Sequence, residues 1–204
     1  MISTGDPGLD ECLEGGYQQG ALHLVVGGTG SGKTSWLRTA IRSALNAGKT
    51  VHIVDQEGSL RSFQGEPHCS ISSSISEPLL PDQGKIDLLV YDDAHLLHTA
   101  QELGVARWVT SFFVPNLRLL EHPVKLVSWQ ARAALPGSLG VPKALNFSAD
   151  VVLHLHRAED SRDIRAILRK NRFGLTGQEF GYSLPEVRPI IRRTIWERLQ
   201  VEPV

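Results

Sequence analysis

The first quarter of the chain contains two apolar runs separated by a segment with helical periodicity. Residues 21–28 form an apolar run that ends in two glycines, which is typical of a buried strand. Residues 32–49 place their apolar side chains three and four positions apart, so they predict a helix that Gly48 caps. Residues 49–57 repeat the buried-strand pattern. This order predicts two parallel strands joined by a right-handed crossover.

Further apolar runs continue the sheet, and they fall at residues 85–94, 124–131 and 150–157. Residues 164–173 follow a polar turn and alternate in character, so they predict an antiparallel partner for the last of these strands. We therefore expect an α/β fold in three layers, with a mostly parallel central sheet and an antiparallel hairpin at one edge.

The segments between these strands are less regular. Residues 58–84 are rich in Ser, Pro and Gly and predict at most a short edge strand at residues 68–72. Residues 96–113 have helical spacing that is interrupted near Gly104, and Pro115 ends or kinks this helix. Residues 132–145 predict a loop, because they contain both Gly and Pro.

One core domain accounts for most of the chain. With 204 residues, of which 41% are hydrophobic, the chain can bury one well-packed core. We assign residues 1–184 to this core and residues 185–204 to a tail whose apolar positions have helical spacing. The two cysteines, Cys12 and Cys69, lie far apart and match no metal or redox spacing, and we find no signal peptide and no apolar run long enough to span a membrane. We therefore expect a cytoplasmic protein.

The charge is nearly balanced but unevenly distributed. Lys and Arg number 21 against 22 Asp and Glu, giving a net charge of -1, which excludes a strongly basic protein that coats nucleic acid. The residues before Pro123 carry a net charge of -6 and those after it +5. The basic half could face a polyanion or an acidic half of another subunit, or the charges could simply be solvated.

A phosphate-binding motif lies between the first predicted strand and the first predicted helix. Residues 27–34, GGTGSGKT, match the pattern G-x-x-x-x-G-K-[ST]. In this pattern, backbone N–H groups and the helix N-terminus hold phosphates, Lys33 bridges the β- and γ-phosphates, and Thr34 ligates Mg²⁺. The predicted nucleotide-binding residues are Gly27, Gly28, Thr29, Gly30, Ser31, Gly32, Lys33 and Thr34.

Two strand ends supply carboxylates for metal binding and hydrolysis. A Mg²⁺–nucleotide site needs a carboxylate on a neighbouring strand, and the run LLVYDDAH places Asp92 directly after four apolar residues. Hydrolysis also needs a base that polarises the attacking water, and both Glu57 and Asp93 qualify by position. We prefer Glu57 and keep Asp93 as the alternative.

Five segments in order resemble the superfamily of RecA, RadA, KaiC and DnaB-type helicases. The opening STGDPGLDECLEGG resembles the segment that precedes the phosphate loop in RadA and KaiC, and VDQEGSL resembles the segment that ends in the catalytic glutamate. LVSWQAR, KALNFSADVVLHLHR and RKNRFGLTG are similar to later segments of RadA and the helicases. The resemblance covers about residues 3–184 and implies a RecA-like P-loop ATPase core.

The resemblance also implies roles for later residues. Gln130 takes the position of a polar sensor of the γ-phosphate, and Lys170 and Arg172 take positions that enter the nucleotide site of a neighbouring subunit. The loop from Arg132 to Lys143 takes the position of a loop that contacts nucleic acid. ATP, Mg²⁺, single-stranded DNA and other copies of the chain, as a ring or filament, are the implied partners.

The chain also departs from these relatives. Because the phosphate loop starts at Gly27, we expect neither the amino-terminal domain of a replicative helicase nor the polymerisation segment of a recombinase before it. Residues 58–84 are also short for the helical layer that the relatives carry there. We therefore expect assembly through the faces of the core, or action with a larger recombinase or helicase.

Three functions remain open on the sequence. The first is an ATPase that hydrolyses Mg-ATP and acts on DNA, in recombination and repair or as a helicase-like motor. The second is a regulatory or scaffold protein, a recombinase paralogue or KaiC-like switch, with slow turnover and no direct DNA work. The third, a small phosphotransferase, predicts an Arg-rich lid that we do not find.

Overall fold

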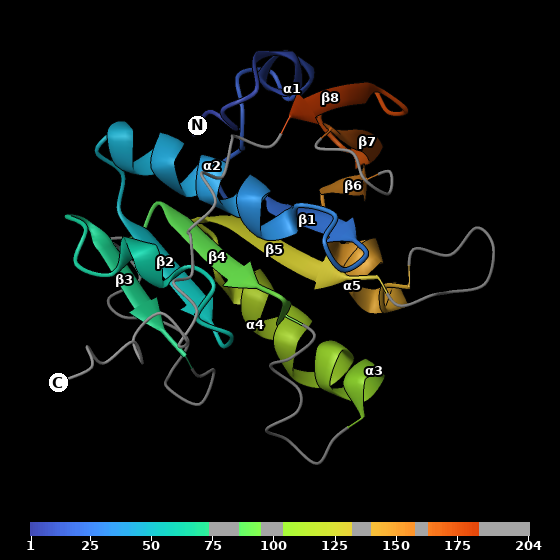
Figure 1. Ribbon diagram of the computed structural model, residues 1–204. Coiled ribbons are helices and arrows are strands. Elements are labelled where there is room, and N and C mark those ends of the chain that lie inside the picture. The colour runs from blue at the N-terminus through green and yellow to red at the C-terminus, as the bar shows by residue number, and fades with distance from the viewer. Residues whose placement is uncertain (74–85, 95–103, 132–139, 158–162, 184–204) are drawn as a thin grey trace, which may run out of the picture.

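Eight strands form one twisted sheet at the centre of the molecule (Figure 1). The computed structural model describes residues 1–73, 86–94, 104–131, 140–157 and 163–183. The sheet order is β3-β2-β4-β5-β1-β6-β7-β8, parallel as far as β6 and antiparallel at β7 and β8. The strands are β1 Leu22–Gly27, β2 Val51–Asp55, β3 Cys69–Ser72, β4 Leu88–Asp92, β5 Val124–Gln130, β6 Val151–Arg157, β7 Asp163–Asn171 and β8 Glu179–Ser183.

Helices cover both faces of the sheet and complete three layers. One hydrophobic cluster joins α2 to the sheet, and a second cluster on the opposite face joins the sheet to the helical segment that includes α3 and α4. The helices are α1 Pro7–Cys12, α2 Lys33–Asn46, α3 Val105–Trp108, the π-helical segment η4 Val109–Phe113, α4 Val114–Leu119 and α5 Lys143–Ser148, with a 3₁₀ turn, η1, at Arg61–Phe63. Within the described residues, no helix has the length and apolar character needed to cross a membrane.

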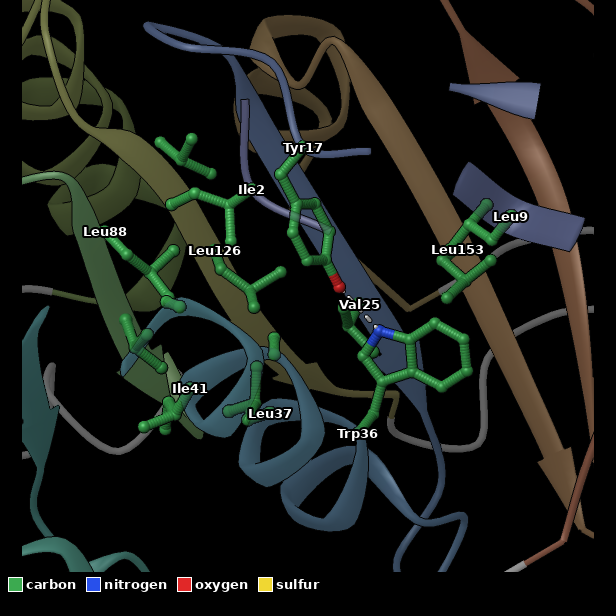
Figure 2. Packing of buried hydrophobic residues seen from close by; sticks show 14 of the residues in the cluster. Ile2, Leu9, Tyr17, Val25, Trp36, Leu37, Ile41, Leu88, Leu126 and Leu153 are labelled. Atoms are coloured by element: carbon green, nitrogen blue, oxygen red, sulfur yellow. Dashed lines mark hydrogen bonds between the residues drawn. The ribbon is translucent and has the colours of Figure 1, made fainter. Parts of the chain in front are cut away.

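Figure 2 shows how α2 is held on the sheet. Leu37 and Ile41 project from α2 toward the sheet, where Leu126 of β5 and Leu88 of β4 lie, and both are fully buried. Trp36 of the same helix donates a hydrogen bond of 3.0 Å from Nε1 to the hydroxyl oxygen of Tyr17. Because the strands beneath are covered on both faces, β1, β2 and β4 are buried along their whole length. This packing fixes the N-terminus of α2 over the end of β1.

The predicted three-layer α/β fold is confirmed, and so is the end of its longest helix. Gly48 has a φ of +69°, its N–H donates to Leu45 at 2.9 Å, and the next N–H, from Lys49, donates to Ala44 at 3.0 Å. These two bonds form a Schellman motif, in which glycine adopts the left-handed conformation without a Cβ penalty. The predicted edge strand at residues 68–72 also forms, as β3.

Of the two outcomes predicted at Pro115, an end or a kink of the helix, the end is wrong. The helix continues past Pro115 through α4 to Leu119. Residues 96–103 of the predicted helix lie outside the described residues. The turn before α4, η4, is π-helical. This wider turn lets the helix continue although proline has no backbone N–H to donate. Within the described residues, the antiparallel edge has three strands rather than a hairpin, because β8 pairs with β7. The short helices α1 and α5, six residues each, were also not predicted, since they are too brief to show a helical period.

Candidate nucleotide-binding site

The phosphate loop connects β1 to α2 and depends on its glycines. Gly30 and Gly32 have φ values of +72° and +92°, and Gly32 is the N-cap of α2. A Cβ on Gly27 would collide with Ser31 Oγ and lie 2.9 Å from the carbonyl oxygen of Leu155. The loop therefore turns back on itself where a side chain cannot fit, and it presents the first N–H groups of α2 at the edge of the sheet.

A cleft of about 380 Å³ opens over this loop at the carboxyl edge of the parallel strands. It brings together predicted site residues from separate segments of the chain. Parallel strands end at the same edge of the sheet, and the loops that follow them meet there. The cleft is lined by Thr29, Gly30, Gly32, Lys33, Thr34, Ser35, Glu57, Asp93, Gln130 and Arg157.

Lys33 is a buried cation at the floor of the cleft. Only 6% of the residue is exposed. Its Nζ donates to the carbonyl oxygen of Gly28 at 3.2 Å and lies 3.7 Å from Asp93 Oδ1. The ammonium group is thus aimed across the phosphate loop, where an anion would find it desolvated and strongly attractive.

Asp92 is buried directly beside Thr34. Its carboxylate accepts hydrogen bonds from Thr34 Oγ1 at 3.1 Å, Ser59 Oγ at 2.5 Å and Ser128 Oγ at 2.8 Å. Thr34 and Asp92 therefore present two adjacent oxygens, a hydroxyl and a carboxylate, of the kind that Mg²⁺ prefers.

The strand that was predicted to end at Glu57 ends two residues earlier, at Asp55. The Asp55 carboxylate accepts N–H bonds from Gly58 at 2.8 Å and Leu60 at 2.7 Å, and these bonds turn the chain out of the sheet. Glu57 lies on this turn, is exposed and faces the cleft. Partial burial, and then the negative charge of Asp93, raise the pKa of its carboxyl group.

Asp93 has a different environment from Glu57. Its backbone is in the left-handed region, with a φ of +45°, and its N–H donates to Ser128 Oγ at 2.7 Å. Its carboxylate is the ion-pair partner of Lys33. The two candidate bases thus lie in the same cleft, one paired with the lysine and one open to solvent.

Gln130 is the last residue of β5 and the register partner of Gly27. Its Nε2 donates to Thr29 Oγ1 at 2.6 Å, so it is in direct contact with the phosphate loop. An amide in this position can exchange its loop contact for a phosphate oxygen.

Lys170 and Arg172 do not lie in the cleft of their own chain. Lys170 Nζ donates to the carbonyl oxygens of Phe147 at 2.9 Å and Ala149 at 2.5 Å, beside the end of α5. Arg172 Nη1 is paired with Asp150 Oδ1 at 2.9 Å. Lys143 begins α5 and is exposed, whereas Arg132 and the tail from residue 185 lie outside the described residues.

The register of β6 shows which edge Lys170 occupies. Lys170 pairs with Val152 near the start of β6, whereas Gly27 of the phosphate loop pairs with Leu155 near its end. Three residues of strand separate the two positions, which is roughly 10 Å. Lys170 and Arg172 therefore belong to the amino edge of the parallel strands, opposite the phosphate loop.

Four residues near the cleft were not assigned a role from the sequence. Ser59 and Ser128 donate hydrogen bonds to the Asp92 carboxylate, and Asp55 accepts N–H bonds from the loop that carries Glu57. Arg157 lines the cleft, with its Nη1 3.4 Å from the carbonyl oxygen of Gly30. The positions of Asp55, Arg157 and Ser128 at or near strand ends were the available signal. No pattern pointed to Ser59, because its role arises from a contact with a residue 33 positions away.

The cleft fits a magnesium-bound nucleoside triphosphate. Ser31 Oγ is buried on the phosphate loop and has no hydrogen-bond partner among the described residues, which leaves a donor for an oxygen-rich ligand. Lys33 supplies a desolvated cation, and Thr34 with Asp92 supplies the metal-binding oxygens. This set matches the needs of a polyphosphate and its cation rather than those of a neutral ligand.

Comparison with known proteins finds a family-model match and several sequence relatives. Residues 2–65 match the family model described as ATPase: KaiC. The DNA repair protein RadA of Mycolicibacterium smegmatis is 28% identical over 191 residues, covering 84% of this chain and 41% of that protein. The DNA repair and recombination protein RadB of Methanoculleus marisnigri is 26% identical over 223 residues, covering 91% and 95%. The chain thus spans less than half of the RadA protein but nearly all of the RadB protein.

Solved structures show the same architecture. The RadB recombinase superposes with a TM-score of 0.65 at 21% identity, covering 91% of this chain and 96% of that one. The KaiC-like protein PH0186 of Pyrococcus horikoshii OT3 superposes with a TM-score of 0.69 at 20% identity, covering 90% and 95%. The fold is therefore the RecA-like P-loop fold. RadA and RadB proteins are sequence relatives of the chain, and the resemblance of its motifs predicted the RadA relationship.

Proposed function

We propose that this chain is an ATPase that hydrolyses Mg-ATP and acts on DNA in recombination or repair. One observation carries the proposal: a single cleft joins the phosphate loop to the carboxylates and the amide that hydrolysis requires. The names of the RadA and RadB relatives, which describe DNA repair and recombination, support the DNA part.

The phosphate loop and two oxygens hold the nucleotide and its cation. The N–H groups of residues 28–34 and the Lys33 ammonium bind the β- and γ-phosphates. Thr34 and Asp92 would hold Mg²⁺, since they already lie 3.1 Å apart. Mg²⁺ held by Thr34 and Asp92 would supply positive charge that stabilises the phosphate oxygens.

Glu57 positions the attacking water. It faces the cleft and is exposed, and its raised pKa brings it nearer to neutrality, where a general base is most effective. Asp93 is less suited to this role because its carboxylate is the partner of Lys33. Gln130 senses the γ-phosphate, since it contacts Thr29 of the phosphate loop and can report a change there.

Lys170 and Arg172 act on the site of a neighbouring subunit. Both lie at the amino edge of the parallel strands, so they are remote from their own phosphate loop. A guanidinium group supplied by a neighbour stabilises the charge of the transferred phosphoryl group and makes hydrolysis depend on assembly. This role requires Arg172, whose side chain is half exposed, to leave the partly buried Asp150.

A second function is an ATP-dependent switch or scaffold with slow turnover. The match of residues 2–65 to the KaiC model and the superposition on a KaiC-like protein favour it. In this function, bound ATP sets the assembly state and DNA has no effect on hydrolysis.

Steady-state ATP hydrolysis with and without single-stranded DNA separates the two. We expect DNA to stimulate the wild-type rate several-fold at about 50 mM salt, and the stimulation to fade near 200 mM because phosphate contacts release counterions. The Lys33→Ala variant is the blank and should show no hydrolysis. Slow hydrolysis that ignores DNA would favour the switch, and an unchanged rate in Lys33→Ala would refute the site.

A further inference from the structure

The hydroxyl of Ser59 connects the metal side of the cleft to the side that carries the base. Ser59 follows Glu57 by two residues, and its Oγ donates to Asp92 Oδ2 at 2.5 Å. Thr34 Oγ1 donates to the same oxygen at 3.1 Å. One carboxylate oxygen is therefore shared by α2, which holds the phosphates, and by the loop that holds Glu57.

The backbone of this loop is held by other contacts. The Asp55 carboxylate accepts N–H bonds from Gly58, Ser59 and Leu60 at 2.8, 3.2 and 2.7 Å. Arg38 Nη2 donates to the carbonyl oxygen of Ser59, and the Leu60 side chain is fully buried in the core. Loss of the Ser59 hydroxyl thus leaves the loop folded and removes only its link to Asp92.

We propose that Ser59 is a positioning residue that fixes Glu57 relative to the metal-binding carboxylate. The inference rests on the proposed hydrolysis of Mg-ATP. A hydrogen bond to an ionised carboxylate is shorter and stronger than one between neutral groups, so this contact restrains the loop tightly. Glu57 then stays within hydrogen-bond reach of the water that attacks the γ-phosphate. A misplacement of a catalytic group by about 1 Å costs on the order of 100-fold in rate.

Ser128 supplies an internal comparison. Its Oγ donates to the other oxygen of Asp92, Oδ1, at 2.8 Å, and accepts the N–H of Asp93. It lies on β5 and makes neither of the bonds that join the Glu57 loop to Asp92 or Asp55. Ser59 and Ser128 therefore bind the same carboxylate, but only Ser59 couples it to the base.

The test compares the kinetics of substitutions at residue 59. Ser59→Ala should lower kcat about tenfold or more at saturating Mg²⁺ and ATP, with the KM for ATP within about threefold of wild type. Ser59→Thr keeps the hydroxyl and should restore kcat, whereas Ser59→Val has the same shape without the hydroxyl and should not. Ser62→Ala, an exposed serine on the following turn η1, is the matched control with wild-type kinetics.

A double variant decides whether Ser59 acts through Glu57. In a Glu57→Gln background, Ser59→Ala should cause no further loss, because the residue that Ser59 positions is already inactive. An equal further loss, a rise in KM with unchanged kcat, or a Ser59→Val variant as active as Ser59→Thr would overturn the proposal. Hydrolysis by Lys33→Ala at the wild-type rate, or none by wild type, would overturn the proposed function along with it.

Discussion

At the level of single residues, the cleft places neighbouring carboxylates in different environments. Asp92 is 3% exposed and receives three hydroxyl donors. Asp93, next in the chain, turns the other way with a positive φ and pairs with Lys33. Glu57 lies on the turn after β2 and remains open to the cleft. We therefore expect the environment of each carboxylate, rather than its residue type, to decide which one binds metal and which one activates water.

Substitution of Glu57 tests this division. Glu57→Gln should retain ATP binding but lower kcat by at least about 100-fold, because an amide cannot accept the proton of the attacking water. Asp93→Asn should lower kcat less, since it mainly removes the partner of Lys33. Single-turnover hydrolysis with a nucleotide-binding assay measures both effects. The reverse order, with Asp93→Asn the slower variant, would assign the base to Asp93.

The hydrolysis rates of wild type and Glu57→Gln should depend differently on pH. Partial burial and the charge of Asp93 raise the pKa of Glu57, so its carboxylate is lost at a higher pH than that of a free glutamate. A profile of kcat/KM from pH 4 to 8, which reports the free enzyme, should therefore fall on the acidic side through this raised pKa in wild type. In Glu57→Gln the fall should be absent from the residual rate.

At the level of elements, β1 is a central strand of the sheet, and the phosphate loop connects its end to the start of α2. It is buried along its length and carries His23, which is 2% exposed and meets the ring of Tyr17 edge-on at 4.9 Å. Burial, and then the charge of Lys125, lower the pKa of His23 to about 3. The strand therefore tolerates this histidine only in its neutral form.

His23 should make the fold sensitive to acid. The unfolded chain binds the proton below about pH 6.5, whereas the folded chain resists it down to about pH 3, so stability is lost as the pH falls through this window. From pH 7 to pH 5 the loss attributable to His23 is about 2 kcal/mol. Urea unfolding at both values should show His23→Phe losing about that much less than wild type. His122→Phe, at an exposed histidine after α4, should lose as much as wild type.

At the level of the whole molecule, the two sets of residues that we propose to bind phosphate lie at opposite edges of the parallel strands. The phosphate loop follows the end of β1, whereas Lys170 and Arg172 lie beside the start of β6. A single copy of the chain cannot bring these sets together without rearranging its sheet. Assembly of copies is the arrangement that would complete a site.

Mixing two inactive variants tests this arrangement. Lys33→Ala subunits keep Arg172, and Arg172→Ala subunits keep the phosphate loop, so a mixture should regain part of the wild-type hydrolysis where the two adjoin. A mixture of Arg172→Ala with the Lys33→Ala, Arg172→Ala double variant should stay inactive. Arg165→Ala, at an exposed arginine of β7 paired with Glu179 at 3.6 Å, is the control that should remain active alone. Mixed assemblies without recovered activity would contradict a role in a neighbour's site.

The sequence by itself determined the features that depend on neighbours along the chain. Hydrophobic periodicity predicted the three-layer α/β fold, and the left-handed turn of Gly48 follows from local backbone chemistry. The phosphate loop was also predictable, because its glycines, Lys33 and Thr34 act within eight consecutive residues. Such features need no information on packing.

Only the tertiary structure decided the contacts between distant segments. These contacts join residues up to 127 positions apart. They include the three hydroxyl groups that donate to Asp92, the approach of Arg157 to Gly30, and the pairing that places Lys170 at the far edge of the sheet. Pro115 likewise remains inside a helix because a π turn and the packing of its face compensate for the missing donor. These outcomes depend on strand order and side-chain packing, which no local pattern records.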